Sequence, residues 1–158
     1  MAEDIKFRHT MPVQIRFSDV DQFGHMNNSV YFSLYDLAKT TYIKDVFGSA
    51  DWSKLAIVVA NINANFFMPV FFSDHLVIET AVVHLGHKSF TLLQRAVTTD
   101  THEVKCECRT VMVGYDLATK EPKLISEDYK EAICRYEEKT LEAVSYTHLR
   151  AHETSLHL

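Results

Sequence analysis

Hydrophobic and polar positions alternate with two different periods along the chain of 158 residues. Residues 13–18 alternate strictly and predict a short strand. Over residues 29–47, apolar side chains recur at spacings of three and four, which predicts one long helix with a broad apolar face. Asn27 or Asn28 is a suitable N-cap for this helix, and Gly48 is a suitable stop.

The pattern changes to a period of two after this helix. Alternation over 56–67, 75–85, 89–99 and 103–115 predicts four strands, the last three joined by short turns into an antiparallel meander. A final helix is expected with Ser126 as its N-cap. No helix separates the later strands, which excludes a parallel sheet of strand–helix–strand units. We therefore predict an α+β protein in which a five-stranded antiparallel sheet wraps around one long central helix, the hotdog arrangement.

The length fits one domain, and no internal repeat interrupts the pattern. We predict a single domain over residues 1–144. The segment 145–158 carries three of the nine histidines but has neither an amphipathic stripe nor capping residues. We interpret it as a non-native extension or a disordered tail. His148 and His152 are four residues apart, but a third ligand is missing, so no metal site is predicted.

Composition excludes several classes of protein. The net charge is −5 and the sequence has no basic run of five residues, which excludes a nucleic-acid binder, although two or three local cations could hold the phosphates of a small ligand. Cys106, Cys108 and Cys134 match neither a disulfide framework nor a zinc signature and fit reduced thiols in a cytoplasmic protein. The N-terminus lacks the apolar region of a signal peptide, and no apolar run reaches the ~18 residues of a membrane span.

The loop directly before the long helix, residues 19–28, carries the candidate chemistry. It combines two carboxylates, an imidazole, a glycine and the amides of Asn27 and Asn28. A helix start offers N–H groups without intrahelical acceptors, which can polarise a carbonyl or hold an oxyanion. A carboxylate held close to it can act as nucleophile or general base, and these two parts suffice for hydrolytic acyl transfer. Asp, Asn and Gly are also common in helix-entry loops for turn and capping reasons alone, so the residues by themselves leave both interpretations open.

A family resemblance favours the catalytic interpretation. The stretch Asp19-x-Asp21-x-x-Gly24-His25-x-Asn27-Asn28-x-x-Tyr31 resembles the signature of the 4-hydroxybenzoyl-CoA thioesterase-like family of hotdog enzymes. Two weaker matches follow in the expected order. They are the segment 65–70 (NFFMPV) followed by Asp74, and the turn 86–90 (GHKSF). Together the similarity covers residues 11–137.

The resemblance implies an acyl-CoA thioesterase in which Asp21 attacks the thioester carbonyl or activates a water molecule. The backbone N–H of Asn28 would polarise that carbonyl. His25 and Asn27 would line the same pocket, and Asp19 would support the loop. The His-x-Asn-Asn form is typical of the branch that acts on fatty acyl-CoA, so an aliphatic acyl group is expected.

The resemblance also bears on partners. No cofactor is expected, because coenzyme A is part of the substrate. A homo-oligomer is implied, either a dimer or a dimer of dimers, with neither nucleic acid nor a membrane as partner. Tyr31 is expected to contact the acyl group as well as to pack the helix against the sheet. Lys88 and Ser89 are candidate ligands of the CoA phosphates, although a turn lysine is commonly only solvated.

Two other functions fit the same fold, because one scaffold hosts several chemistries. A hydroxyacyl thioester dehydratase also places a carboxylate or a histidine beside the central helix, but its motif differs from the one found here. A non-catalytic acyl-CoA-binding protein is disfavoured by the intact Asp21. Ligand binding without turnover would indicate that third function.

Overall fold

The computed structural model describes residues 5–48 and 56–138. Its elements in chain order are β1 (His9–Val13), the 3-10 helix η1 (Phe17–Asp19), α1 (Asn28–Phe47), β2 (Ile57–Phe66), β3 (Leu76–Leu85), β4 (Ser89–Thr98), β5 (Val104–Asp116), β6 (Glu121–Pro122) and α2 (Glu127–Glu137). The long helix and the four long strands therefore lie close to their predicted ranges. The predicted tail, residues 145–158, lies outside the described residues.

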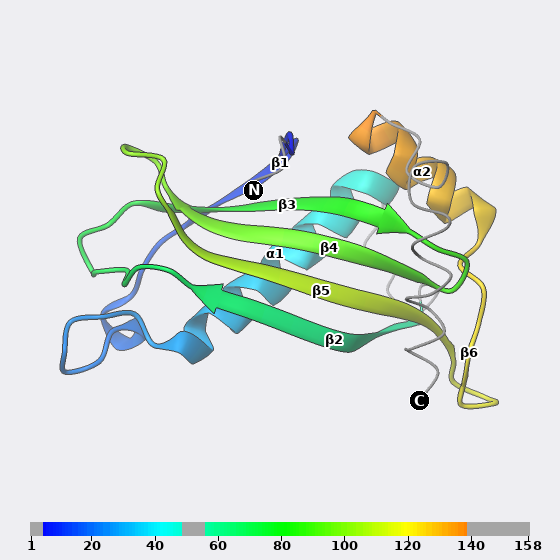
Figure 1. The fold of residues 1–158 in the computed structure, drawn as a ribbon, viewed down its shortest axis with the longest axis horizontal. Helices are drawn as coiled ribbons and strands as arrows, with labels where there is room; N and C mark the ends of the chain where they lie inside the picture. Colours follow the sequence, from blue (N-terminus) through cyan, green and yellow to red (C-terminus); the bar gives the residue numbers. More distant parts are fainter. Residues whose placement is uncertain (1–4, 49–55, 139–158) are drawn as a thin grey trace. The chain divides into compact units, whose positions relative to one another are not determined.

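The strands form one sheet in the order β1-β3-β4-β5-β2, with β6 beside β5 (Figure 1). β1 pairs antiparallel with β3, from His9 opposite Thr80 to Val13 opposite Leu76. This antiparallel sheet with a long helix packed on it confirms the predicted hotdog fold. The sheet has six strands rather than five, because the chain turns back after β5 and residues 121–122 pair with 115–116. A strand of two residues is too short to leave a period of two in the sequence.

The first strand lies earlier than the alternation predicted. It occupies His9–Val13 rather than residues 13–18. Val13 and Ile15 do pack in the core, but the chain leaves the sheet after Val13 and turns into η1. Phe17, the next apolar residue of the alternation, is 83% exposed. The alternation of apolar and polar residues therefore continues past the end of the strand, into residues that pair with no neighbouring strand.

The capping residues predicted for the two helices are confirmed where the structure tests them. α1 ends at Phe47, and Gly48 follows with a φ of +67°, a conformation that glycine adopts without steric cost. The Ser126 side chain accepts a hydrogen bond from the Tyr129 N–H at 3.3 Å, and α2 begins at the next residue. None of the helices in the described residues is long and apolar enough to span a membrane.

Contacts divide the chain into two compact units. Of the described residues, the first contains 5–42, 64–81 and 94–108, and the second contains 43–48, 56–63, 82–93 and 109–138. In the first unit, the Tyr35 hydroxyl of α1 donates to the Cys106 carbonyl of β5 at 3.2 Å, and the fully buried Gln94 amide of β4 donates to the Tyr35 carbonyl at 3.0 Å. In the second, the Glu137 carboxylate at the end of α2 accepts the Val82 N–H of β3 at 3.1 Å. The prediction of one domain over 1–144 stays a prediction.

Gly114 of β5 lies so close to the backbone of Lys123 that no side chain fits between them. A Cβ at this position would stand 2.6 Å from the Lys123 carbonyl oxygen, while the Lys123 N–H donates to the Gly114 carbonyl at 2.9 Å. We expect Gly114→Ala to lower the free energy of unfolding by about 1–3 kcal/mol, because the added methyl group must displace hydrogen-bonded backbone. Urea denaturation of the two proteins measures the difference. Equal urea midpoints for the two proteins would show that the backbone around Lys123 can move to accept the methyl group without loss of stability.

Candidate active site

Asp19 fixes the entrance of the loop that precedes α1. Its carboxylate accepts the Arg16 backbone N–H at 2.8 Å and the Arg16 Nη2 at 2.9 Å, which closes the 3-10 turn Phe17–Asp19. The side-chain hydrogen bond from the Arg16 guanidinium lowers the pKa of Asp19, although burial acts in the opposite direction. Asp19 is 4% exposed, so the carboxylate is an anchor of the backbone and is not presented to solvent.

Asp21 lies at the base of a tight hairpin turn and is exposed. The Gly24 N–H donates to the Asp21 carbonyl at 3.0 Å, and the Asp21 N–H donates to the His25 carbonyl at 2.9 Å. Gly24 has a φ of +83°, which a turn followed by a glycine bulge requires. Oδ1 of Asp21 accepts the Phe23 N–H at 2.9 Å and the His25 N–H at 3.4 Å. The turn therefore fixes one carboxylate oxygen and leaves the other, Oδ2, without a hydrogen bond among the described residues.

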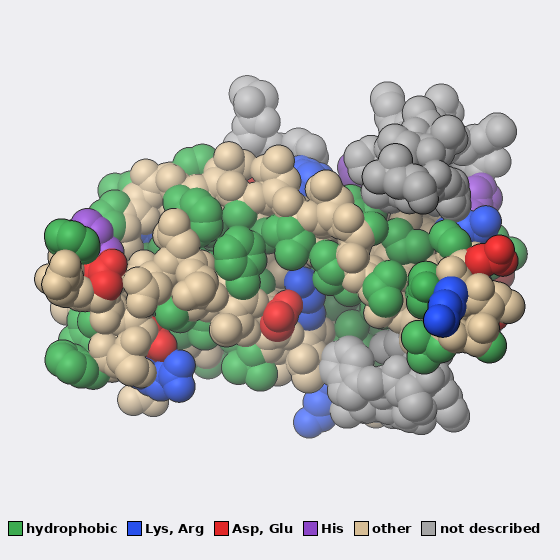
Figure 2. Space-filling view, turned by 90° about the horizontal axis from the view of Figure 1, so that it is seen from below, with side chains coloured by type: hydrophobic (Ala, Val, Ile, Leu, Met, Phe, Trp, Pro, Cys, Tyr) green, Lys and Arg blue, Asp and Glu red, His purple; other side chains and the backbone are tan. Residues whose placement is uncertain are grey.

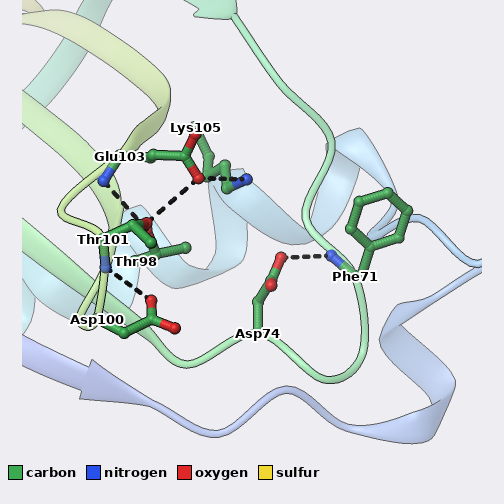
Figure 3. Close-up of polar contacts among 7 residues, drawn as sticks. All are labelled: Phe71, Asp74, Thr98, Asp100, Thr101, Glu103 and Lys105. Atoms are coloured by element: carbon green, nitrogen blue, oxygen red, sulfur yellow. Dashed lines mark hydrogen bonds and ion pairs between the residues drawn. The ribbon is translucent and has the colours of Figure 1, made fainter.

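The turn before β3 holds the opposite side of the loop. The Met26 N–H donates to the Val70 carbonyl at 2.7 Å, and His25 forms a β-bridge with Phe71. The Phe71 ring meets the His25 imidazole edge-on, with 5.2 Å between the ring centroids. Asp74 closes this turn, because its carboxylate accepts the Phe71 N–H at 2.9 Å (Figure 3). The Asp74 of the second motif match thus helps to position His25.

The start of α1 completes the site. The Asn27 N–H donates to the Asp19 carbonyl at 2.9 Å, and the Asn27 carbonyl accepts the Val30 N–H at 3.0 Å. Asn28 is the first residue of α1, so its N–H has no intrahelical acceptor. None of the hydrogen bonds between the described residues uses this N–H. The positive end of a 20-residue helix therefore offers a donor that a ligand carbonyl could occupy.

The predicted site residues are divided between the two units. Asp21, His25, Asn27, Asn28 and Tyr31 all belong to the first unit, whereas Lys88 and Ser89 belong to the second. Tyr31 is 2% exposed and packs edge-on against Phe66, and burial raises its pKa, so the phenol stays protonated at neutral pH. Ser89 is buried at the start of β4, and its carbonyl accepts the Gly86 N–H at 2.7 Å.

Two residues of the site were missed in the sequence. Arg16 forms an ion pair with Asp19, and its spacing of three from Asp19 is the only signal that could have indicated this. Phe71 lies against His25 through tertiary packing and left no local signal at all. Among residues 5–48 and 56–138, no group of three or more His, Cys, Asp or Glu side chains could hold a metal ion.

The Arg16–Asp19 pair leads to a prediction about pH. Because the pKa of Asp19 is lowered in the folded protein, its charged form stabilises the fold above the ordinary aspartate pKa of about 3.9, and this stability is lost as pH falls through the lowered value. Asp19→Asn should therefore lower the free energy of unfolding by about 1–3 kcal/mol at neutral pH, and by less at pH about 3. Urea denaturation at both pH values checks this. A difference that stays constant with pH would contradict the role of the Asp19 charge.

Fold and site together define the class of protein: a hotdog protein with an exposed carboxylate held by a turn in the loop that leads into its central helix, whose first N–H is unused among the described residues. Residues 15–133 match the family model of the Thioesterase-like superfamily, and the chain belongs to that superfamily. The resemblance predicted from the three motifs is thereby confirmed.

Individual relatives cover most of the chain. It is 26% identical over 123 residues to "Long-chain acyl-CoA thioesterase FadM" of Escherichia coli. The aligned region covers 77% of this chain and 93% of that protein. It is also similar to the structure of a thioesterase from Thermus thermophilus complexed with coenzyme A and Zn. That pair has a TM-score of 0.75 and 26% identity, and covers 84% of this chain and 96% of the other. A 1,4-dihydroxy-2-naphthoyl-CoA thioesterase from Synechocystis shares the fold at 15% identity, with a TM-score of 0.72 over 80% and 95% of the two chains.

Proposed function

We propose that the protein is an acyl-CoA thioesterase that hydrolyses aliphatic acyl-CoA to the free acid and CoA. Membership of the superfamily supports this, as does the similarity to a relative named for long-chain acyl-CoA and to a thioesterase complexed with coenzyme A. The observation that carries the proposal is the Asp21 carboxylate, which its own turn holds at Oδ1 in the loop that leads into α1, whose first N–H, that of Asn28, is unused among the described residues.

The reaction uses the two carboxylate oxygens differently. Oδ1 is held by two backbone N–H groups, so Oδ2 either attacks the thioester carbon or removes a proton from an attacking water molecule. In both routes the carbonyl oxygen becomes negatively charged and accepts the Asn28 N–H, which stabilises the transition state. The C–S bond then breaks and the CoA thiolate takes up a proton. In the first route, water afterwards hydrolyses the anhydride formed on Asp21.

The other predicted residues have supporting roles in this proposal. His25 and Asn27 line the pocket on either side of Met26 and position the thioester or the water. Tyr31, a buried neutral phenol on α1, contacts the acyl group. Lys88 and Ser89 serve the CoA moiety. Substitution of any of these residues should lower activity less than substitution of Asp21, because it would alter how the substrate is positioned but would leave the reacting carboxylate in place.

We further propose that the working unit is a homodimer, or a dimer of dimers. β2 is the last strand in the sheet order, and eight of its ten residues are exposed. Exposed apolar residues continue directly beyond it at Phe67 and Met68. Figure 2 views the molecule from the side on which β2 lies in Figure 1, and hydrophobic side chains spread over that face. A long apolar edge strand is a template for pairing with a second chain.

Release of free thiol from a panel of acyl-CoA substrates, butyryl to palmitoyl, tests the proposal. Steady turnover of aliphatic substrates is expected. Binding of acyl-CoA without thiol release would instead support an acyl-CoA-binding protein. Loss of water from a hydroxyacyl-CoA without thiol release would support a dehydratase. Either of these results overturns the thioesterase proposal.

A further inference from the structure

The His25 imidazole lies in the first unit and has a single aromatic contact among the described residues. His25 is exposed, and none of the hydrogen bonds or ion pairs in residues 5–48 and 56–138 uses its imidazole. The Phe71 ring meets the imidazole edge-on, with 5.2 Å between the centroids and an angle of 81° between the planes. Both imidazole nitrogens therefore stay available to a ligand, while the Phe71 ring restricts how the imidazole can turn.

Hydrogen bonds of the backbone fix the place of Phe71. Its N–H donates to the Asp74 carboxylate at 2.9 Å (Figure 3), and the Asp74 N–H donates in return to the Phe71 carbonyl at 3.0 Å. The preceding residue, Val70, is fully buried, and its carbonyl accepts the N–H of the buried Met26 at 2.7 Å. Residues directly opposite each other in an antiparallel bridge place their side chains on the same face, so the bridge between His25 and Phe71 brings the two rings together.

The next residue of the same turn, Phe72, has a different partner. Its ring meets the Phe17 ring of η1 edge-on, with 6.2 Å between the centroids. Phe71 is 44% exposed and Phe72 is 52% exposed, so the two phenyl rings resemble each other in all but the side chain that they touch. Of the two, Phe71 is the one in ring contact with a predicted site residue, His25.

We propose that Phe71 is a positioning residue for thioester hydrolysis, and that it acts by holding the His25 imidazole in the orientation that meets the thioester or the attacking water. The inference rests on the proposed thioesterase function and adds to it a residue from outside the catalytic loop. An exposed imidazole without this contact exchanges between several rotamers. An edge-on aromatic pair favours one orientation by a factor of about 2 to 12, and turnover should depend on Phe71 to the same extent.

A double-mutant cycle tests whether Phe71 acts through His25. Phe71→Leu keeps an apolar side chain but removes the ring, so kcat for an acyl-CoA should fall about 2- to 12-fold. In the His25→Ala background, Phe71→Leu should have no further effect, because the imidazole that it orients is absent. Phe72→Leu is the matched control and should change kcat in neither background. An equal fall for Phe71→Leu in both backgrounds would overturn the inference, because a residue that only supports the fold acts independently of His25.

The orientation of the imidazole is also measured without turnover, by NMR of the histidine ring protons. The ring current of Phe71 displaces the His25 resonances, which are assigned by their loss in His25→Ala. Phe71→Leu should move these resonances toward those of an unfolded chain, and Phe72→Leu should leave them in place. Unchanged His25 resonances in Phe71→Leu would overturn the inference. Absence of thiol release by the native protein would refute the thioesterase function and the catalytic role with it, while the resonances would still report whether Phe71 fixes the imidazole.

Discussion

Asp21→Asn is expected to lower kcat for acyl-CoA hydrolysis by about 10²–10⁴-fold while leaving the thermal midpoint of unfolding unchanged. The asparagine carbonyl oxygen can still accept the N–H groups of Phe23 and His25, so the turn keeps its shape. The amide has no negative charge, however, so it can neither attack a thioester nor take a proton from water. Thiol release and a thermal unfolding scan on the same preparation measure both quantities.

The matched control is Asp100→Asn. Asp100 is also an exposed turn aspartate whose Oδ1 accepts a backbone N–H, that of Thr101 at 2.8 Å, but it lies in the turn between β4 and β5 (Figure 3). Its replacement should change neither kcat nor stability. If Asp21→Asn kept turnover within a few fold of the native protein, Asp21 would not be the reacting group. A large fall in the unfolding midpoint would show instead that its charge maintains the turn.

The fold could be predicted to the extent that its elements are long and are bounded by turn residues. α1 is a run of twenty residues in which apolar side chains recur at spacings of three and four, and β2 to β5 are runs of ten or more residues separated by short turns, so their positions followed from the sequence. β1 was misplaced because Ile15 is buried outside any strand, and this extended the alternation past Val13. β6 could not be predicted, since two residues contain less than one full repeat.

The candidate site shows the same division between local and tertiary information. The loop was found because its motif is contiguous, and the contacts that shape Asp21 all lie within five residues of it. The contact of His25 with Phe71 crosses 46 positions of the sequence, and only tertiary structure provides it. Asn28 matters through a backbone N–H, for which residue identity carries no signal. A motif thus predicts which loop reacts, whereas the partners that orient it depend on how distant turns pack.

Burial in β2 points to a surface that one chain does not cover. The sequence places Asn61, Asn63 and Asn65 on one face of this strand and Ile62 on the other, and an ordinary sheet would bury the second face. In the structure Ile62 is 45% exposed, as is Val59 on the asparagine face. Apolar residues thus stay exposed on both faces of this strand, and this exposure is the observation behind the proposed homodimer.

Ile62→Asp is expected to weaken this dimer by at least 100-fold in dissociation constant. Ile62 lies near the middle of β2, so in a two-fold symmetric antiparallel pairing of two β2 strands it lies close to its own copy. Each substitution removes about 1.5–3 kcal/mol of apolar burial, and the two new carboxylates repel each other across the strand pair. Analytical ultracentrifugation over a range of concentrations measures the constant.

Leu117→Asp is the control for the dimer experiment, because Leu117 is 72% exposed and lies in the turn between β5 and β6, outside β2. It makes the same change of charge and apolar area without touching the proposed interface, so its dissociation constant should equal that of the native protein. A native protein that sediments as a monomer at every concentration would contradict the dimer. Equal weakening by both variants would place the interface elsewhere, because the effect would then follow charge and not position.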